Sequence, residues 1–336
     1  MSTVAPAPSP ELFFDTMFAY QRTAALKAAI ELDVFTALAE GVHTVSDVAR
    51  RCGASERGIR ILCDSLTIMG FLTKSVDGYE LTAESALFLT KGSPAYLGVA
   101  ADFLAASHTM RNFEHLADTI RHGVVPPEEN TVGHENPIWV QFARAMAPTM
   151  VPQAHAIADV LGVDTAGPIR VLDIAAGHGM FGIVIAKRNP SAEIVAVDWT
   201  PVLAVSIENA EAQGVAPRVR ALGGDAFTVD YGTGFDIVLM TNFLHHFDRS
   251  TCVDLLRKAA AALKTGGRIA ILEFVPNEDH VSPPLAAAFS LTMLGGTPGG
   301  EAYSFSEHRG MLIEAGFRDA VAHALPVLQT IIVAST

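Results

Sequence analysis

The chain of 336 residues has few cysteines, few basic residues and no long uninterrupted apolar segment. Its three cysteines, Cys52, Cys63 and Cys252, lie far apart and form no CxxC pair, which indicates reduced thiols in a cytoplasmic protein. Lys and Arg number 23 against 36 Asp and Glu, so the formal net charge is −13. This acidic balance argues against nucleic acid or an anionic membrane as the main partner.

Targeting and membrane signals are also missing from the sequence. Residues 1–10, MSTVAPAPSP, have no basic region and no apolar stretch after them, so they predict a short disordered tail and not a signal peptide. No run of about 18 uncharged apolar residues occurs, so no membrane span is expected. Half of the residues are nevertheless hydrophobic, which is enough for a sizeable core and a subunit interface.

Residues 11–40 have apolar side chains at helical spacing with few charges between them. Leu26, Ile30 and Val34, for example, recur every four residues. The segment is too apolar for a solvated arm, so we expect it to pack against a second subunit. A homodimer is the expected assembly, because twofold pairing is the commonest one.

Residues 41–92 show the pattern of a winged helix. Helices are predicted over 45–52 and 55–69, and a hairpin signal follows with its turn at 76–78. Such a module either reads DNA or serves as a structural or dimerising unit. It contains six Lys and Arg against six Asp and Glu, whereas a DNA reader needs a basic face. We therefore expect residues 11–95 to be a winged-helix dimerisation domain.

Residues 96–165 are predicted to be a helical connector that contributes to a small-molecule pocket. Breaks are expected at Gly123–Gly133 and near Pro148 and Pro152, and Gly162–Pro168 is the expected linker into the second domain.

Three histidines of the connector recur every seven residues, at His108, His115 and His122. Seven residues are two helical turns, so these side chains are roughly 10 Å apart along one face, too far for one metal ion. No metal site is therefore expected, and His108 lining a pocket is the preferred interpretation.

From residue 166 to residue 336, short apolar strands alternate with helical segments. This alternation indicates an α/β domain whose parallel sheet is covered by helices on both faces. The predicted strands are Arg170–Ile174, Glu193–Val197, Val219–Leu222, Phe235–Met240 and Arg268–Phe274.

The turn after the first of these strands is rich in small residues. Asp173–Gly179, DIAAGHG, leads into a helix, and small residues let the backbone turn sharply and approach a ligand closely. The turn would lie at the carboxyl ends of parallel strands, where open α/β sheets bind ligands. By itself this loop fits a dinucleotide equally well.

Two further carboxylates narrow the ligand to one that contains adenosine. Asp198 ends the second strand and can accept both ribose hydroxyls, while Asp225 follows the third strand and can accept from the adenine amino group. Phe227 would then form an apolar wall. Trp199 either packs on the adenine or belongs to the ordinary core, and the sequence leaves both open.

A pair of histidines follows the fourth strand, in Asn242–Asp248. His245 is a candidate general base beside the ligand site, although a structural, hydrogen-bonded histidine remains the alternative, and more so for His246. Glu273 ends the fifth strand on the same edge, where it could orient an imidazole and favour its charged form.

Together these segments resemble the class I S-adenosylmethionine-dependent small-molecule O-methyltransferases, of the plant phenolic and bacterial natural-product kind, over nearly the whole chain. VLDIAAGHG is similar to the glycine loop of the family, DWTPVL to its ribose segment and GGDAF to its adenine segment. LHHFD resembles the segment with the catalytic histidine, which falls on His245, and ILEFVP places Glu273 as its partner.

The resemblance implies a winged-helix dimerisation domain followed by a Rossmann-like domain that uses S-adenosyl-L-methionine and releases S-adenosyl-L-homocysteine. The chain departs from the family pattern at two places. Ala175 and Ala176 stand where glycine is usual, and Gly299–Tyr303 places Ala302 at the position of a second carboxylate, with Glu301 one residue earlier.

Site residues follow from the strand ends and the resemblance combined, and the catalytic pair is His245 and Glu273. The expected cofactor residues are Asp173, Ala175, Gly177, Gly179, Asp198, Trp199, Gly224, Asp225, Ala226, Phe227 and Asn242. The expected acceptor pocket consists of Phe103, His108, Trp139, Phe142, Met146, Phe289, Met293 and Leu294.

Methyl transfer to oxygen is the leading hypothesis, on a small hydroxylated aromatic or conjugated molecule. Three alternatives stay open: a C-methyltransferase that uses the same base, a protein that binds the cofactor without transferring methyl, and a winged-helix regulator that senses a small molecule.

Overall fold

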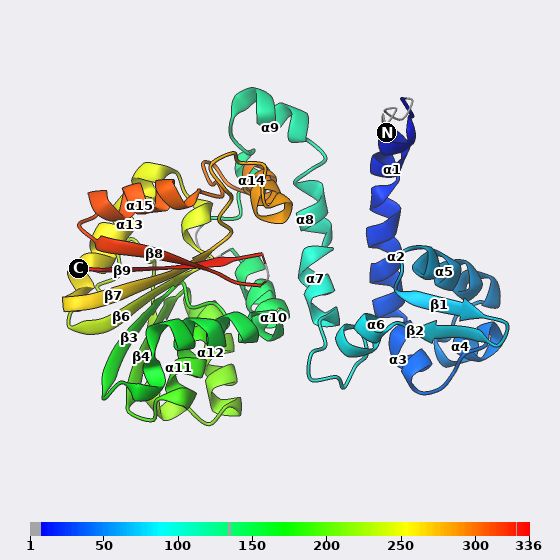
Figure 1. Ribbon diagram of the computed structural model, residues 1–336, viewed down its shortest axis with the longest axis horizontal. Coiled ribbons are helices and arrows are strands. Elements are labelled where there is room, and N and C mark those ends of the chain that lie inside the picture. The colour runs from blue at the N-terminus through cyan, green and yellow to red at the C-terminus, as the bar shows by residue number, and fades with distance from the viewer. Residues whose placement is uncertain (1–7, 134–135, 327) are drawn as a thin grey trace, which may run out of the picture. The chain divides into compact units, whose positions relative to one another are not determined.

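The computed structural model describes residues 8–133, 136–326 and 328–336, and its chain divides into two compact units, Met1–Ser107 and His108–Thr336 (Figure 1). None of the helices within these described ranges is both long enough and apolar enough to cross a lipid bilayer.

The first unit has the predicted helix–helix–hairpin pattern. Thr44 begins one helix by accepting the N–H of Asp47, and Ser55 begins the next by accepting the N–H of Gly58, as expected for N-caps. The elements of this unit are α1 (Glu11–Met17), α2 (Ala19–Glu31), α3 (Val34–Ala39), α4 (Val45–Arg51), α5 (Glu56–Ile68), β1 (Leu72–Ser75), β2 (Gly78–Leu81), α6 (Ala83–Phe88), η1 (Gly98–Ala100) and α7 (Ala101–Leu104).

A hydrophobic core holds the winged-helix part of this unit together, with Phe35, Ile59, Leu66 and Tyr79 fully buried in it. The first two helices differ, because α1 has no buried residue and α2 buries only Ala29. Leu12, Phe13 and Met17 are 78%, 61% and 56% exposed. These helices therefore present an apolar surface that the rest of their own unit leaves uncovered.

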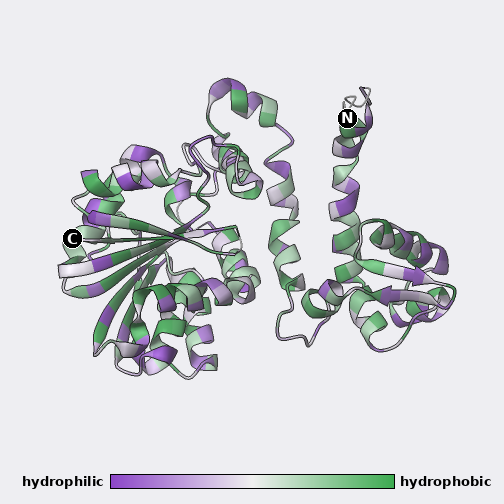
Figure 2. Cartoon of the chain, in the orientation of Figure 1, coloured by the Kyte–Doolittle hydropathy of each residue, from purple (hydrophilic) through white to green (hydrophobic). Residues whose placement is uncertain are grey.

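The second unit is built on a seven-stranded sheet of order β5-β4-β3-β6-β7-β9-β8. The strands from β5 to β7 are parallel, as predicted, and the central ones are mainly apolar (Figure 2). The prediction of an all-parallel sheet is wrong at one edge, because β9 pairs antiparallel with both β7 and β8. The strands are β3 (Ile169–Ile174), β4 (Ala192–Asp198), β5 (Val219–Gly223), β6 (Phe235–Thr241), β7 (Leu263–Glu273), β8 (Arg318–Ala324) and β9 (Thr330–Ser335).

Helices cover both faces of this sheet, with α10, α11 and α12 on one face and α13 and α15 on the other (Figure 1). This confirms the predicted α/β class. The helical elements are α8 (Ser107–Arg111), α9 (Leu116–His122), η2 (Pro127–Glu129), α10 (Ile138–Leu161), η3 (Val163–Thr165), α11 (Met180–Arg188), α12 (Thr200–Ala212), η4 (Ala216–Arg218), η5 (Leu244–His246), α13 (Arg249–Ala262), α14 (Pro284–Gly296) and α15 (Phe305–Glu314).

The breaks expected near Pro148 and Pro152 do not occur, because α10 continues through both prolines. Each proline removes one helical N–H donor, so the helix has a local cost at these positions. Apolar packing offsets that cost, since Ala154, Ile157 and Leu161 of α10 are buried in the core that α11 also lines. This packing places α10 in the second unit.

Candidate active site

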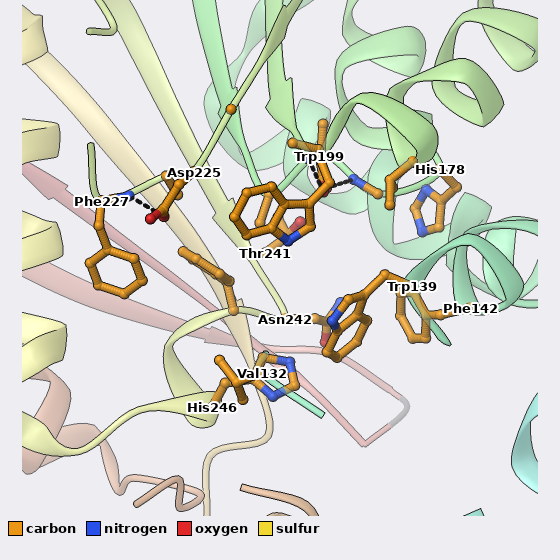
Figure 3. Close-up of a pocket in the computed structure, with 18 of the residues that line it drawn as sticks. Val132, Trp139, Phe142, His178, Trp199, Asp225, Phe227, Thr241, Asn242 and His246 are labelled. Atoms are coloured by element: carbon orange, nitrogen blue, oxygen red, sulfur yellow. Dashed lines mark hydrogen bonds between the residues drawn. The ribbon is translucent and has the colours of Figure 1, made fainter. Parts of the chain in front are cut away.

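A pocket opens at the carboxyl ends of β3, β4, β5 and β6, where the strand order reverses between β3 and β6 (Figure 3). This is the position at which open α/β sheets bind ligands. The space between the protein atoms, part of it open to solvent, is about 1050 Å³. The residues that line it are Val132, Trp139, Phe142, Ala175, Ala176, Gly177, His178, Phe181, Asp198, Trp199, Val202, Gly224, Asp225, Ala226, Phe227, Thr241, Asn242, Phe243, His246 and Phe247.

The loop between β3 and α11 takes backbone conformations that favour glycine. Gly177 and Gly179 have φ angles of 55° and 74°, and Ala175 also has a positive φ of 55°. A Cβ at Gly179 would lie 2.1 Å from Ser206 Oγ, whereas one at Gly177 would meet nothing nearer than 3.9 Å. Gly179 is therefore required for packing against α12, and the loop leaves open space at Gly177.

Asp198 fixes this loop from the end of β4. Its two carboxylate oxygens accept the backbone N–H groups of Gly177 at 2.8 Å and of Trp199 at 2.7 Å. Burial raises the pKa of Asp198 to about 6, although both N–H groups act in the opposite direction. Each oxygen retains a lone pair, so the carboxylate can accept further hydrogen bonds from a ligand.

The far side of the pocket is formed by the segment after β5. Asp225 accepts the N–H of Phe227 at 2.9 Å, and both side chains lie together in Figure 3. Trp199 stands between this segment and α10, where its ring lines the pocket and also packs against a small cluster that contains Val202. Trp199 therefore has core contacts, and its packing on adenine stays a prediction.

His245, in η5 after β6, and Glu273, the last residue of β7, form a buried pair, and neither is among the described residues that line the pocket. His245 is 4% exposed and Glu273 is 1% exposed, and Nδ1 of the imidazole is hydrogen-bonded to Oε2 of the carboxylate. The other carboxylate oxygen accepts the N–H groups of Phe243 and Leu244, both at 2.9 Å. Burial by itself would raise the pKa of Glu273, but the charge and hydrogen bond of His245 lower it below its usual value. The carboxylate is thus held ionised against the imidazole.

The second histidine of the motif, His246, lines the pocket directly. Its ring is 4.3 Å from that of His245 and 5.0 Å from that of Trp139, measured between centroids. Burial, followed by the neighbouring His245, lowers the pKa of His246 well below its usual value, so this imidazole is neutral.

Two family models match the chain over its two parts. The model of the O-methyltransferase domain matches residues 113–318, and that of the O-methyltransferase dimerisation domain matches residues 14–91. The chain belongs to the O-methyltransferase family. The resemblance seen in its motifs is confirmed, and the protein is an S-adenosylmethionine-dependent methyltransferase.

Named proteins of similar sequence align with nearly the whole length of this methyltransferase. The 3-hydroxy-5-methyl-1-naphthoate 3-O-methyltransferase of Streptomyces sahachiroi is 29% identical over 311 residues, which are 91% of this chain and 89% of that protein. The mitomycin biosynthesis 6-O-methyltransferase of Streptomyces lavendulae is 27% identical over 333 residues, or 96% and 93%.

Solved structures share the fold throughout. A protein from Nostoc punctiforme, provisionally described as an O-methyltransferase, is 48% identical with a TM-score of 0.94, over 98% of this chain and 100% of that one. Human N-acetylserotonin methyltransferase in complex with S-adenosylmethionine has a TM-score of 0.84 at 24% identity, over 100% and 99%, a likeness in fold alone.

The pocket of the methyltransferase suits this cofactor on its own residues. Asp198 and Asp225 place two carboxylates in the pocket, which can accept hydrogen bonds from hydroxyl and amino groups such as those of adenosine, and the open loop at Gly177 leaves room for a close ligand. Of the expected cofactor residues, nine line the pocket: Ala175, Gly177, Asp198, Trp199, Gly224, Asp225, Ala226, Phe227 and Asn242.

Two expected cofactor residues, Asp173 and Gly179, do not line the pocket. Asp173 is fully buried, accepts the N–H of Gly182 at 3.2 Å, and has its pKa raised to about 7, first by burial. Gly179 packs against Ser206, as described above.

The expected acceptor residues are divided among several places. Trp139 and Phe142 line the pocket, and Phe289 contacts His245 edge-on with ring centroids 4.9 Å apart. His108 lines a separate cavity of the second unit, and Phe103 belongs to the first unit. Met146 packs beside the α10–α11 core, Met293 is buried and Leu294 is half-buried.

The position of the family's second carboxylate is occupied by an alanine. Ala302 is fully buried, and the side chain of Glu301 is exposed. Sequence reasoning missed Thr241 and His178, although His178, a polar residue between two glycines of a strand-to-helix turn, was a usable signal.

Proposed function

We propose that this methyltransferase acts on the hydroxyl oxygen of a small aromatic or conjugated molecule, with His245 as the general base and Glu273 as its orienting partner. The buried His245–Glu273 pair, packed against His246 of the pocket lining, is the observation on which the proposal rests. The name of the Streptomyces sahachiroi relative, a 3-O-methyltransferase of a hydroxynaphthoate, supports an aromatic acceptor.

The chemistry requires a base, because a phenolic hydroxyl ionises near pH 10. When bound, S-adenosylmethionine supplies an electrophilic methyl group on a sulfonium. Beside the bound cofactor, which would give its methyl group to the acceptor oxygen, His245 would accept the acceptor's proton and Glu273 would stabilise the resulting imidazolium. Glu273 also holds Nδ1, which leaves Nε2 as the proton-accepting nitrogen.

The part of the pocket beside His246 is apolar and aromatic. Val132, Trp139 and Phe142 line it, and Trp139 is fixed by the hydrogen bond from its indole N–H to the Thr131 carbonyl at 3.0 Å. Aromatic walls of this kind favour a flat acceptor and exclude water, so that catalysis consists mainly of positioning.

We also propose that the protein is a cytoplasmic homodimer. The apolar surface of α1 and α2, within the segment that matches the dimerisation model, supports self-association. The three cysteines, all unpaired, favour a reducing compartment.

The test uses cofactor with a labelled methyl group and a panel of phenols, hydroquinones and enols. We expect transfer to a hydroxyl oxygen, identified by NMR of the isolated product. Label found on carbon would overturn the O-methyl assignment in favour of a C-methyltransferase. Tight cofactor binding without transfer to any panel member would instead favour a non-catalytic binding protein.

A further inference from the structure

We propose that His178, in the loop between β3 and α11, binds the α-carboxylate of the cofactor through its Nε2–H group. The inference rests on the proposed function as a methyltransferase of this pocket and assigns a residue to the amino-acid end of S-adenosylmethionine. His178 is 3% exposed, lines the pocket, and lies between Gly177 and Gly179 (Figure 3).

The hydrogen bond to Nδ1 determines where the proton of this imidazole resides. The backbone N–H of Met180, at the start of α11, donates to Nδ1 of His178 at 3.1 Å. An amide N–H can only donate, so Nδ1 carries no proton and the neutral ring is protonated at Nε2. Within the described part of the chain, Nε2 has no hydrogen-bond partner.

The orientation of the ring is fixed by its neighbours. Phe142 of α10 is stacked on it at a centroid distance of 6.5 Å, and Phe181 is tilted against it at 5.6 Å. The carbonyl of His178 accepts a hydrogen bond from the side chain of Asn209 on α12 at 2.9 Å. The Nε2–H donor is therefore held in place before any ligand binds, which lowers the entropic cost of using it.

Burial keeps this donor neutral by lowering the pKa of His178 to about 4. Neutrality suits the ligand, because the cofactor already has a positive sulfonium and a charged imidazolium nearby would repel it.

The polar groups that line the pocket differ between its two ends, and each end matches a different part of the ligand. Asp198 and Asp225 can only accept hydrogen bonds when ionised, so they match the hydroxyl and amino groups of adenosine. The described lining residues include no Lys or Arg. His178 lies beside Phe142, across Trp199 from Asp225 and Phe227 (Figure 3). The amino-acid end of the cofactor has an ammonium group, which can only donate hydrogen bonds, and a carboxylate, which can only accept them. The Nε2–H of His178 is a donor and therefore matches the carboxylate.

The experiment compares two ligands by isothermal titration calorimetry: S-adenosylhomocysteine and its decarboxylated analogue, in which hydrogen replaces the α-carboxylate. We expect the wild-type protein to prefer S-adenosylhomocysteine by about 10- to 100-fold, as for a hydrogen bond to a charged group. His178→Phe should remove most of this preference. His246→Phe, which removes the other neutral imidazole of the pocket, is the matched control and should retain it.

A ratio of two affinities separates a lost contact from structural damage, because a distorted loop weakens both ligands together. His178→Asn is the second variant: its amide oxygen can still accept the Met180 N–H, while its shorter side chain withdraws the donor, so the preference should fall here too.

Wild-type protein labelled with ¹⁵N-histidine gives a reading that needs no variant. His178 should show the Nε2–H tautomer and respond to S-adenosylhomocysteine more than to the decarboxylated analogue. Equal affinity of the wild type for both ligands, an unchanged ratio in His178→Phe, or an Nδ1–H tautomer would overturn the inference. Failure of the wild type to bind S-adenosylhomocysteine at all would overturn the proposed function instead.

Discussion

At the scale of single residues, Asp198 connects the glycine loop with the expected ribose site. Asp198→Asn replaces one accepting oxygen by an NH₂ group, which cannot accept from a ribose hydroxyl or from the N–H it now faces. We expect the affinity for S-adenosylhomocysteine, measured by calorimetry, to fall about 10- to 100-fold. Asp254→Asn, at an exposed carboxylate of α13, is the control and should leave the affinity unchanged. Equal affinities of the two variants would show that Asp198 does not contribute to cofactor binding.

His308 offers a residue-scale test of buried charge. It is 1% exposed, and burial lowers its pKa to about 4 from the usual 6.5. Between these values the unfolded chain binds a proton that the folded protein does not, so this residue makes the protein less stable as the pH falls. Relative to His308→Gln, the wild type should lose about 2 kcal/mol of unfolding free energy between pH 7 and pH 5. Urea denaturation measures this, and a difference independent of pH would contradict the assignment.

Some site residues could be predicted from the sequence and others could not. Asp198, Asp225 and Glu273 directly end or follow apolar strands, and parallel strands bring their carboxyl ends to one edge, so strand positions alone place these residues together. The role proposed for His178 depends on the Met180 N–H and on the ring of Phe142, which is 36 residues away in sequence. No local pattern contains that information.

At the scale of elements, the β3–α11 loop depends on glycine at position 179. Gly179→Ala combines a left-handed φ of 74° with a Cβ 2.1 Å from Ser206 Oγ, so we expect a loss of at least about 2 kcal/mol in unfolding free energy. Gly214→Ala is the matched control, since its φ is 70° but nothing lies within 4 Å of the added Cβ. It should cost only about 1 kcal/mol.

A second substitution separates the two causes in the loop. If the steric contact matters, Gly179→Ala combined with Ser206→Ala should recover part of the lost stability. Equal losses in Gly179→Ala and Gly214→Ala, measured by chemical denaturation, would show that packing against α12 is unimportant.

Two differences between the predicted and the observed elements, at β8 and α10, have physical causes. β8 is mostly exposed along its length, so it lacks the apolar run that identifies β3 to β7. α10 contains two prolines, which locally predict a break, yet its packing against α11 maintains one continuous helix. In both cases tertiary contacts outweigh the local signal.

At the scale of the whole molecule, the apolar surface of α1 and α2 is expected to hold two copies together. Replacing Leu12, Phe13 and Met17 by Ser removes exposed apolar area without touching the core of the first unit. We expect sedimentation velocity to show a shift from dimer to monomer. Val281→Ser, at a 70% exposed residue of the second unit, should leave the assembly unchanged. A wild-type protein that sediments as a monomer would contradict the proposed dimer.

Catalysis combines these scales, because the sheet brings together His245 and Glu273 beside His246, which lines a pocket whose walls come from several elements. If proton removal is their function, an acceptor that is already ionised at the assay pH should no longer require the base. Acceptors activated by nitro groups should therefore lose much less rate than unactivated phenols when His245 is replaced.

The most direct test is the single-turnover rate of His245→Gln at pH 7.5 with an unactivated phenolic acceptor. We expect a rate lower by about 10²- to 10⁴-fold with the affinity for S-adenosylhomocysteine intact. A rate equal to that of the wild type would contradict the assignment of His245 as the general base.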